Sequence, residues 1–122
     1  MPGIFYVAIG GASGAVGRYL LSLLPTKGQF PVWTFATNFA GAVLIGFLAG
    51  LLSTKPEYSQ KISLFWKTGV CGGFTTFSTF SLEAFTLLEK GNTVLGVVYI
   101  IGSVLTCLFG VYMGRTMFFF LH

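Results

Sequence analysis

Apolar residues gather along the chain into four long runs, separated by short polar connectors. The runs cover about 3–24, 32–52, 62–88 and 93–120. About 20 helical residues at 1.5 Å each cross the roughly 30 Å hydrocarbon core of a bilayer, so each run is long enough to span it. Because no water satisfies backbone groups there, the spans must be helical. The pattern predicts an all-α membrane protein with four transmembrane helices, forming a single domain over residues 1–122.

The first run has an alternative interpretation as a secretory signal, because the small residues at 10–14 resemble a cleavage site. A signal of that kind carries basic residues ahead of its apolar stretch. None precedes the stretch here, and the apolar pattern continues to Leu24. We therefore expect the first run to be a membrane span.

Composition narrows the class of protein further. Hydrophobic residues make up 54% of the chain and charged residues only 8%, against about 25% charged in soluble domains. The net charge of +4 comes from basic residues that stand singly, at or near the ends of apolar runs, where such side chains reach the membrane interface. A nucleic-acid surface requires a stripe of positive charge, so we exclude nucleic acid as a partner.

The basic residues divide almost evenly between the two sides of a four-span topology. One side holds Lys55, Lys61, Lys67 and Arg115, and the other holds Arg18, Lys27 and Lys90. Orientation depends on a difference in Lys and Arg between the two sides. The sequence therefore permits insertion in both orientations, which allows an antiparallel pair of identical chains.

Small residues four positions apart, such as Gly10 with Gly14 and Gly46 with Gly50, predict close helix contacts. Four helices packed in this way leave no room for a central pore. A transport function would therefore require a second copy of the chain.

The third run contains the densest group of polar residues. The adjacent glycines Gly72 and Gly73, followed by Thr75 and Thr76, make a poor uninterrupted helix. We predict a break between about Gly72 and Thr76, near the middle of this helix. Backbone carbonyls exposed at such a break bind cations in filters and transporters. Alternatively, neighbouring Ser and Thr side chains satisfy the freed groups, and the pattern leaves both interpretations open.

Phenylalanines recur every three residues after the predicted break, at Phe74, Phe77 and Phe80. Their ring edges carry positive partial charge and attract an anion when they face a path. Phenylalanines that face lipid or a protein core are the commoner case. The interleaved hydroxyls favour the anion interpretation, because hydroxyl donors beside ring edges suit a small, hard anion. These hydroxyl residues are Thr75, Thr76, Ser78, Thr79 and Ser81.

Two other runs add polar residues. Asn38 offers two amide donors, although it is equally suited to bonding between helices. In the last run Tyr99, Ser103 and Cys107 lie four residues apart and share one helix face. Together these residues outline a path of uncharged donors. The chain has no aspartate and only one histidine, and we find no catalytic or metal-ligating side-chain cluster, so we do not expect an enzyme.

The run from Gly72 to Glu83, GGFTTFSTFSLE, resembles the signature GGxTTFSTFSxE of the Fluc (CrcB) fluoride channels. Thr34, Asn38 and Gly41 in the second run, and Arg18 in the first, extend the likeness over essentially the whole chain. The resemblance implies an antiparallel, dual-topology homodimer in the bacterial cytoplasmic (inner) membrane. Such a dimer conducts fluoride passively out of the cell along two pathways, which lowers the toxicity of fluoride.

The resemblance also implies roles for individual residues. Phe77 and Phe80 match phenylalanines whose ring edges line the fluoride pathway, and Asn38 matches an asparagine that donates to fluoride. Gly72 and Thr75 match positions whose carbonyls hold a structural, untransported sodium ion (Na+) at the dimer centre. Cys107 replaces a hydroxyl with a weaker donor. The other implied pathway residues are Thr76, Ser78, Thr79, Tyr99 and Ser103, with Glu83 at the mouth and Arg18 in the vestibule.

Two rival functions follow from the same length and composition. A proton-coupled exporter of the small multidrug class also has four spans, but it needs an acidic residue in its first helix. The only charged residue of the first run is Arg18. The other rival is a scaffold subunit of a larger complex, which would not conduct ions when purified alone.

Overall fold

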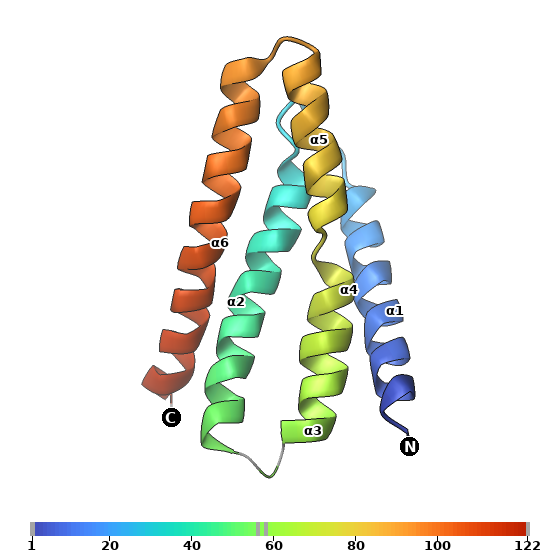
Figure 1. The fold of residues 1–122 in the computed structure, drawn as a ribbon, viewed down its shortest axis with the longest axis vertical. Coiled ribbons are helices and arrows are strands. Elements are labelled where there is room, and N and C mark those ends of the chain that lie inside the picture. The colour runs from blue at the N-terminus through green and yellow to red at the C-terminus, as the bar shows by residue number, and fades with distance from the viewer. Residues whose placement is uncertain (1, 56, 58, 122) are drawn as a thin grey trace.

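The computed structural model describes residues 2–55, 57 and 59–121, and these residues form helices and connectors without a strand. The long helices lie side by side along one axis (Figure 1). The elements in chain order are α1 (Gly3–Ser22), α2 (Val32–Thr54), α3 (Ser59–Ile62), η2 (Ser63–Cys71), α4 (Gly72–Phe74), α5 (Phe77–Glu89) and α6 (Thr93–Leu121).

Three of the described helices, α1, α2 and α6, are long and apolar enough to cross a membrane. Large apolar side chains on their surfaces point outward, among them Ile4 and Val94, which are 72% and 79% exposed. Outward-facing apolar side chains suit a lipid environment. The prediction of a multi-pass α-helical membrane protein is confirmed at this level.

The third apolar run is not one regular helix. It begins with the short α3, continues as the π-helical stretch η2, and then passes through α4 into α5. The wider π-helical turn is uncommon and often occurs at functional positions. Nothing in the sequence analysis predicts it.

Glycines set the closest helix contacts. A Cβ added at Gly114 of α6 would collide with the carbonyl oxygen of Val43 in α2. Likewise, a Cβ at Gly10 or Gly14 of α1 would collide with the backbone of the third segment. The small-residue spacing in the sequence therefore does mark the helix interfaces.

The turn between α5 and α6 brings these two helices together. Gly91 has a φ of +87°, a left-handed conformation that costs glycine little. Next to the turn, Phe80 and Leu87 of α5 and Tyr99 of α6 form a buried cluster. Tyr99 is fully buried, so this cluster fixes α5, and with it the end of the interrupted segment, against α6.

Candidate functional site

The centre of the third segment is an interruption of two residues. α4 ends at Phe74 and α5 begins at Phe77, and Thr75 and Thr76 between them are extended, with ψ of 157° and 119°. The hydroxyl oxygen of Thr76 accepts a hydrogen bond from the Thr79 N–H at 3.1 Å. Thr76 is therefore the N-cap of α5, a position that threonine favours.

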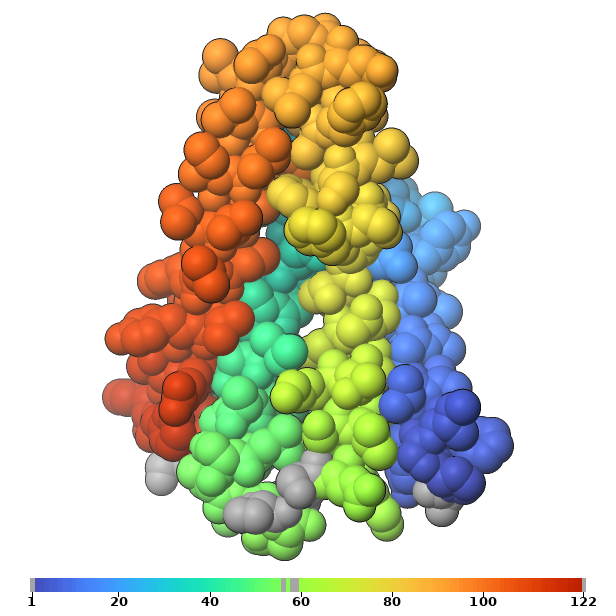
Figure 2. Space-filling view, viewed as in Figure 1, coloured from blue at the N-terminus to red at the C-terminus, as the bar shows by residue number. Residues whose placement is uncertain are grey.

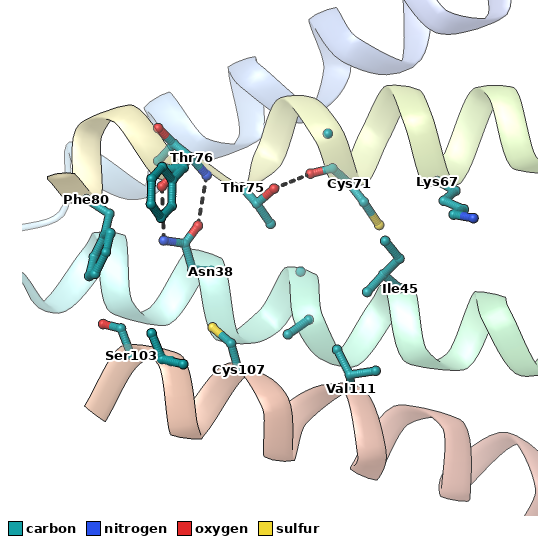
Figure 3. A pocket seen from close by; sticks show the side chains of 15 residues that line it. Asn38, Ile45, Lys67, Cys71, Thr75, Thr76, Phe80, Ser103, Cys107 and Val111 are labelled. Carbon is teal, nitrogen blue, oxygen red and sulfur yellow. Dashed lines mark hydrogen bonds between the residues drawn. The ribbon is translucent and has the colours of Figure 1, made fainter. Parts of the chain in front are cut away.

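The side-chain amide of Asn38 in α2 forms hydrogen bonds with both the N–H and the carbonyl of Thr76 (Figure 3). Its Oδ1 accepts from the Thr76 N–H at 2.8 Å, and its Nδ2 donates to the Thr76 carbonyl at 3.2 Å. The backbone of Thr76 is extended. The Asn38 amide bonds both of its polar groups, as the backbone of a neighbouring strand would. One of the two amide hydrogens is used in this pairing, and the second remains for another acceptor.

The interruption also removes the helical hydrogen-bond donors of the Gly72 and Thr75 carbonyls. In a continuous helix they would accept from the N–H groups of Thr76 and Thr79. Those N–H groups donate to Asn38 Oδ1 and Thr76 Oγ1 instead. The freed amides are satisfied by side chains, whereas the two carbonyls lose their helical donors. Oxygen atoms of this kind are the ligands that hard cations prefer in proteins.

A groove with a volume of about 390 Å³ opens beside the interruption, between α2, α6 and the third segment. Figure 2 shows that the surface is hollowed on this face, between the orange-red α6 and the yellow-green third segment. The groove brings together residues that the sequence predicts for the site, and also Cys107. These predicted residues are Asn38, Gly72, Thr75, Thr76, Phe77, Phe80 and Ser103.

The two phenylalanines of the groove have different environments. Phe80 is 8% exposed, and its ring centroid lies 5.0 Å from that of Tyr99. Phe77 is 78% exposed, and its ring lies 5.7 Å from Phe80. A single chain therefore holds Phe80 rigidly at the groove wall, while Phe77 lies on the rim.

Ser103 and Tyr99 also differ, although they share one helix face. Ser103 is buried, and its hydroxyl has no hydrogen-bond partner within the described chain. The hydroxyl of Tyr99 donates to Glu83 Oε1 at 3.1 Å. An unpaired buried hydroxyl is costly, so Ser103 is the more available donor of the two.

A second cavity, of about 240 Å³, is lined by the two charged residues of the predicted site, Arg18 and Glu83. Arg18, Thr79 and Glu83 line it, and Thr76 lines both cavities. Arg18 Nε donates to the Gly73 carbonyl at 3.3 Å, which ties α1 to the end of α4. Ser78 and Tyr99 line neither of these two cavities.

Sequence reasoning missed three residues of these cavities. Trp33 and Thr37 line the second cavity, where Thr37 is 1% exposed and the Trp33 indole N–H is buried without a partner in the described chain. Their four-residue spacing next to Asn38 was an available signal. Lys67, which the sequence analysis placed near the end of an apolar run, also lines the groove.

The apolar helices, with the interrupted segment and its groove between them, define a multi-pass α-helical membrane protein. The family model described as "CrcB-like protein, Camphor Resistance (CrcB)" matches residues 5–115. The chain therefore belongs to the CrcB family, and the resemblance seen in the sequence is confirmed.

Three curated relatives that cover most of the chain are named "Fluoride-specific ion channel FluC". A relative from Ruminiclostridium cellulolyticum is 44% identical over 94% of this chain and 91% of its own length. One from Pyrococcus furiosus is 43% identical over 88% of this chain and 89% of its own length. One from Rhizobium meliloti is 45% identical over 93% of this chain and 94% of its own length. These relatives are named as channels and not as enzymes.

Proposed function

We propose that this chain forms a fluoride-specific channel, through which fluoride leaves the cell passively and its toxicity falls. Membership of the CrcB family, with relatives named as fluoride channels at 43–45% identity, carries the proposal. The groove beside Asn38 supplies its path. The membrane is the bacterial cytoplasmic membrane, which the chain crosses four times, with the third crossing built from the segment between α3 and α5.

Conduction requires that protein donors replace the water around a small, tightly hydrated anion. Asn38 supplies its second amide hydrogen, and Ser103 supplies a hydroxyl that has no other partner in the described chain. The ring edges of Phe77 and Phe80 add weaker attraction. Because these groups are uncharged, they hold fluoride without trapping it, and the narrow path rejects the larger chloride.

A second copy closes the groove. In a single chain Phe77 is 78% exposed and the groove opens to the surface, so one chain encloses no conduit. An inverted copy, permitted by the even division of basic residues, would cover this face and supply the opposite wall. Two such pathways then run through one antiparallel homodimer, surrounded by lipid.

The carbonyls of Gly72 and Thr75 hold a structural sodium ion between the two copies. Support comes from the diversion of their helical donors to Asn38 and Thr76. A bound sodium ion supplies a fixed positive charge that favours anions nearby. We expect fluoride flux to fall when sodium is replaced by a large organic cation such as N-methyl-D-glucamine, measured as the initial efflux rate from liposomes. Unchanged flux in sodium-free solution would contradict this role.

The remaining predicted residues act around this path. Glu83 lies at its mouth, Arg18 lies in its vestibule and Thr79 supplies a hydroxyl to it, and all three line the second cavity. Tyr99 holds Glu83 in place through its hydrogen bond, and Thr76 caps the N-terminus of α5. Ser78 lies exposed beside Phe77, where a second copy would bring it against the path.

Liposomes that contain only the purified chain test the proposal. We expect rapid fluoride efflux, which would also exclude a scaffold subunit. We expect no cation uptake driven by a pH difference, because α1 contains no acidic residue for proton coupling. Liposomes that retain their fluoride as protein-free liposomes do would refute the proposed function.

A further inference from the structure

Lys67 is a charged residue in the interior of the third segment. It belongs to η2, eight positions after the first residue of α3. Its side chain is exposed in the single chain. A lysine within an apolar segment is unfavourable in lipid and is normally directed into a polar cavity or towards a partner.

The lysine lines the same groove as the fluoride path residues. η2 and the start of α4 turn Lys67, Cys71 and Gly72 towards the groove, and Figure 3 shows Lys67 at the end opposite Phe80. It is the only charged side chain among the described residues that line this groove, and none of them is acidic. The positive charge therefore has no carboxylate beside it within the groove.

We infer that Lys67 is an anion-recruiting site, which concentrates small inorganic anions at the far end of the groove and speeds their access to Asn38. This inference rests on the proposed fluoride function. Low-dielectric walls focus the field of a charge in a cleft, and such steering raises association rates by about 10-fold to 10³-fold. Lipid phosphate is the competing partner for an exposed lysine, and the experiment separates the two.

The experiment measures initial fluoride efflux from liposomes at two ionic strengths, set with an impermeant salt. At about 0.01 M the Debye length is about 30 Å, and at about 1 M it is about 3 Å. We expect Lys67→Met to lower efflux about 3-fold to 10-fold at low ionic strength and less than about 2-fold at high ionic strength. Lys67→Arg keeps the rate and its salt dependence, and Lys67→Glu is slower than Lys67→Met.

Lys61→Met is the matched control, because Lys61 lies in α3 of the same segment and does not line the groove. If Lys67→Met gives no folded protein, Lys67→Gln, which keeps a polar side chain of similar reach, carries the same comparison. Equal efflux by wild-type and Lys67→Met at both ionic strengths would overturn the inference. So would a loss that appears in anionic liposomes and vanishes in phosphatidylcholine, since that result assigns the lysine to lipid phosphate. Wild-type protein without any flux would instead refute the proposed function itself.

Discussion

Replacing Asn38 with aspartate changes one group, the amide nitrogen that donates to the Thr76 carbonyl. The oxygen that accepts from the Thr76 N–H at 2.8 Å is retained. The second carboxylate oxygen takes the place of the nitrogen that lies 3.2 Å from the Thr76 carbonyl oxygen. Two acceptors then face each other with no hydrogen between them. Leaving a neutral acceptor unpaired costs about 1–3 kcal/mol of folding stability, and a charged one costs more, so folding of the variant is measured separately from its flux.

The effect on fluoride flux is electrostatic and is separate from the effect on stability. An ionised carboxylate about 4 Å from a fluoride ion repels it by about 4 kcal/mol at an effective dielectric constant of about 20. At about 1.4 kcal/mol for each factor of ten, the expected loss of flux is about 10³-fold. Asn38→Asp should therefore stop measurable conduction while the purified protein still elutes at the wild-type volume in size-exclusion chromatography.

Asn92→Asp is the matched control. It adds the same charge in the connector between α5 and α6, where the Asn92 amide donates to Gln29 Oε1 outside both cavities. The assay is initial fluoride efflux from liposomes at equal protein content. Efflux by Asn38→Asp within 2-fold of the control variant would refute the placement of Asn38 on the path.

Two further predictions concern the groove wall and the helix contacts. Phe80→Ile removes the ring that lies 5.0 Å from Tyr99, and we expect at least a 10-fold loss of fluoride efflux with the protein still folded; full conduction would place the path elsewhere. Gly114→Ala puts a methyl group against the Val43 carbonyl and should lower stability by about 1–3 kcal/mol, measured as the thermal unfolding midpoint in detergent. Gly102→Ala, which meets nothing within 4 Å, should leave the midpoint unchanged or slightly higher, and equal losses in both variants would contradict the packing described.

The sequence predicts the helices well because apolar length alone specifies them. α1 ends at Ser22 and α2 at Thr54, each within two residues of the expected 24 and 52. The glycine pair, whose helix propensity is low, also lies one residue before the interruption at Thr75 and Thr76. These are local properties, and local properties can be read from the order of residues.

The pairing of Asn38 with Thr76 was beyond local reasoning, because it joins residues 38 positions apart. The two phenylalanines illustrate a second limit. A step of three residues rotates a helical side chain by about 300°, so Phe77 and Phe80 point about 60° apart. That angle is enough to bury one ring against Tyr99 and leave the other 78% exposed. The π-helical geometry that brings Lys67 to the groove had no sequence signal.

The selectivity of the purified chain tests the central claim most directly, since the claim is that uncharged donors in a narrow groove conduct fluoride. Liposomes loaded with equal concentrations of fluoride and chloride permit both effluxes to be followed with ion-selective electrodes in one sample. We predict that fluoride leaves within the time of the experiment while chloride stays at the level of protein-free liposomes. Parallel release of both anions would contradict the account.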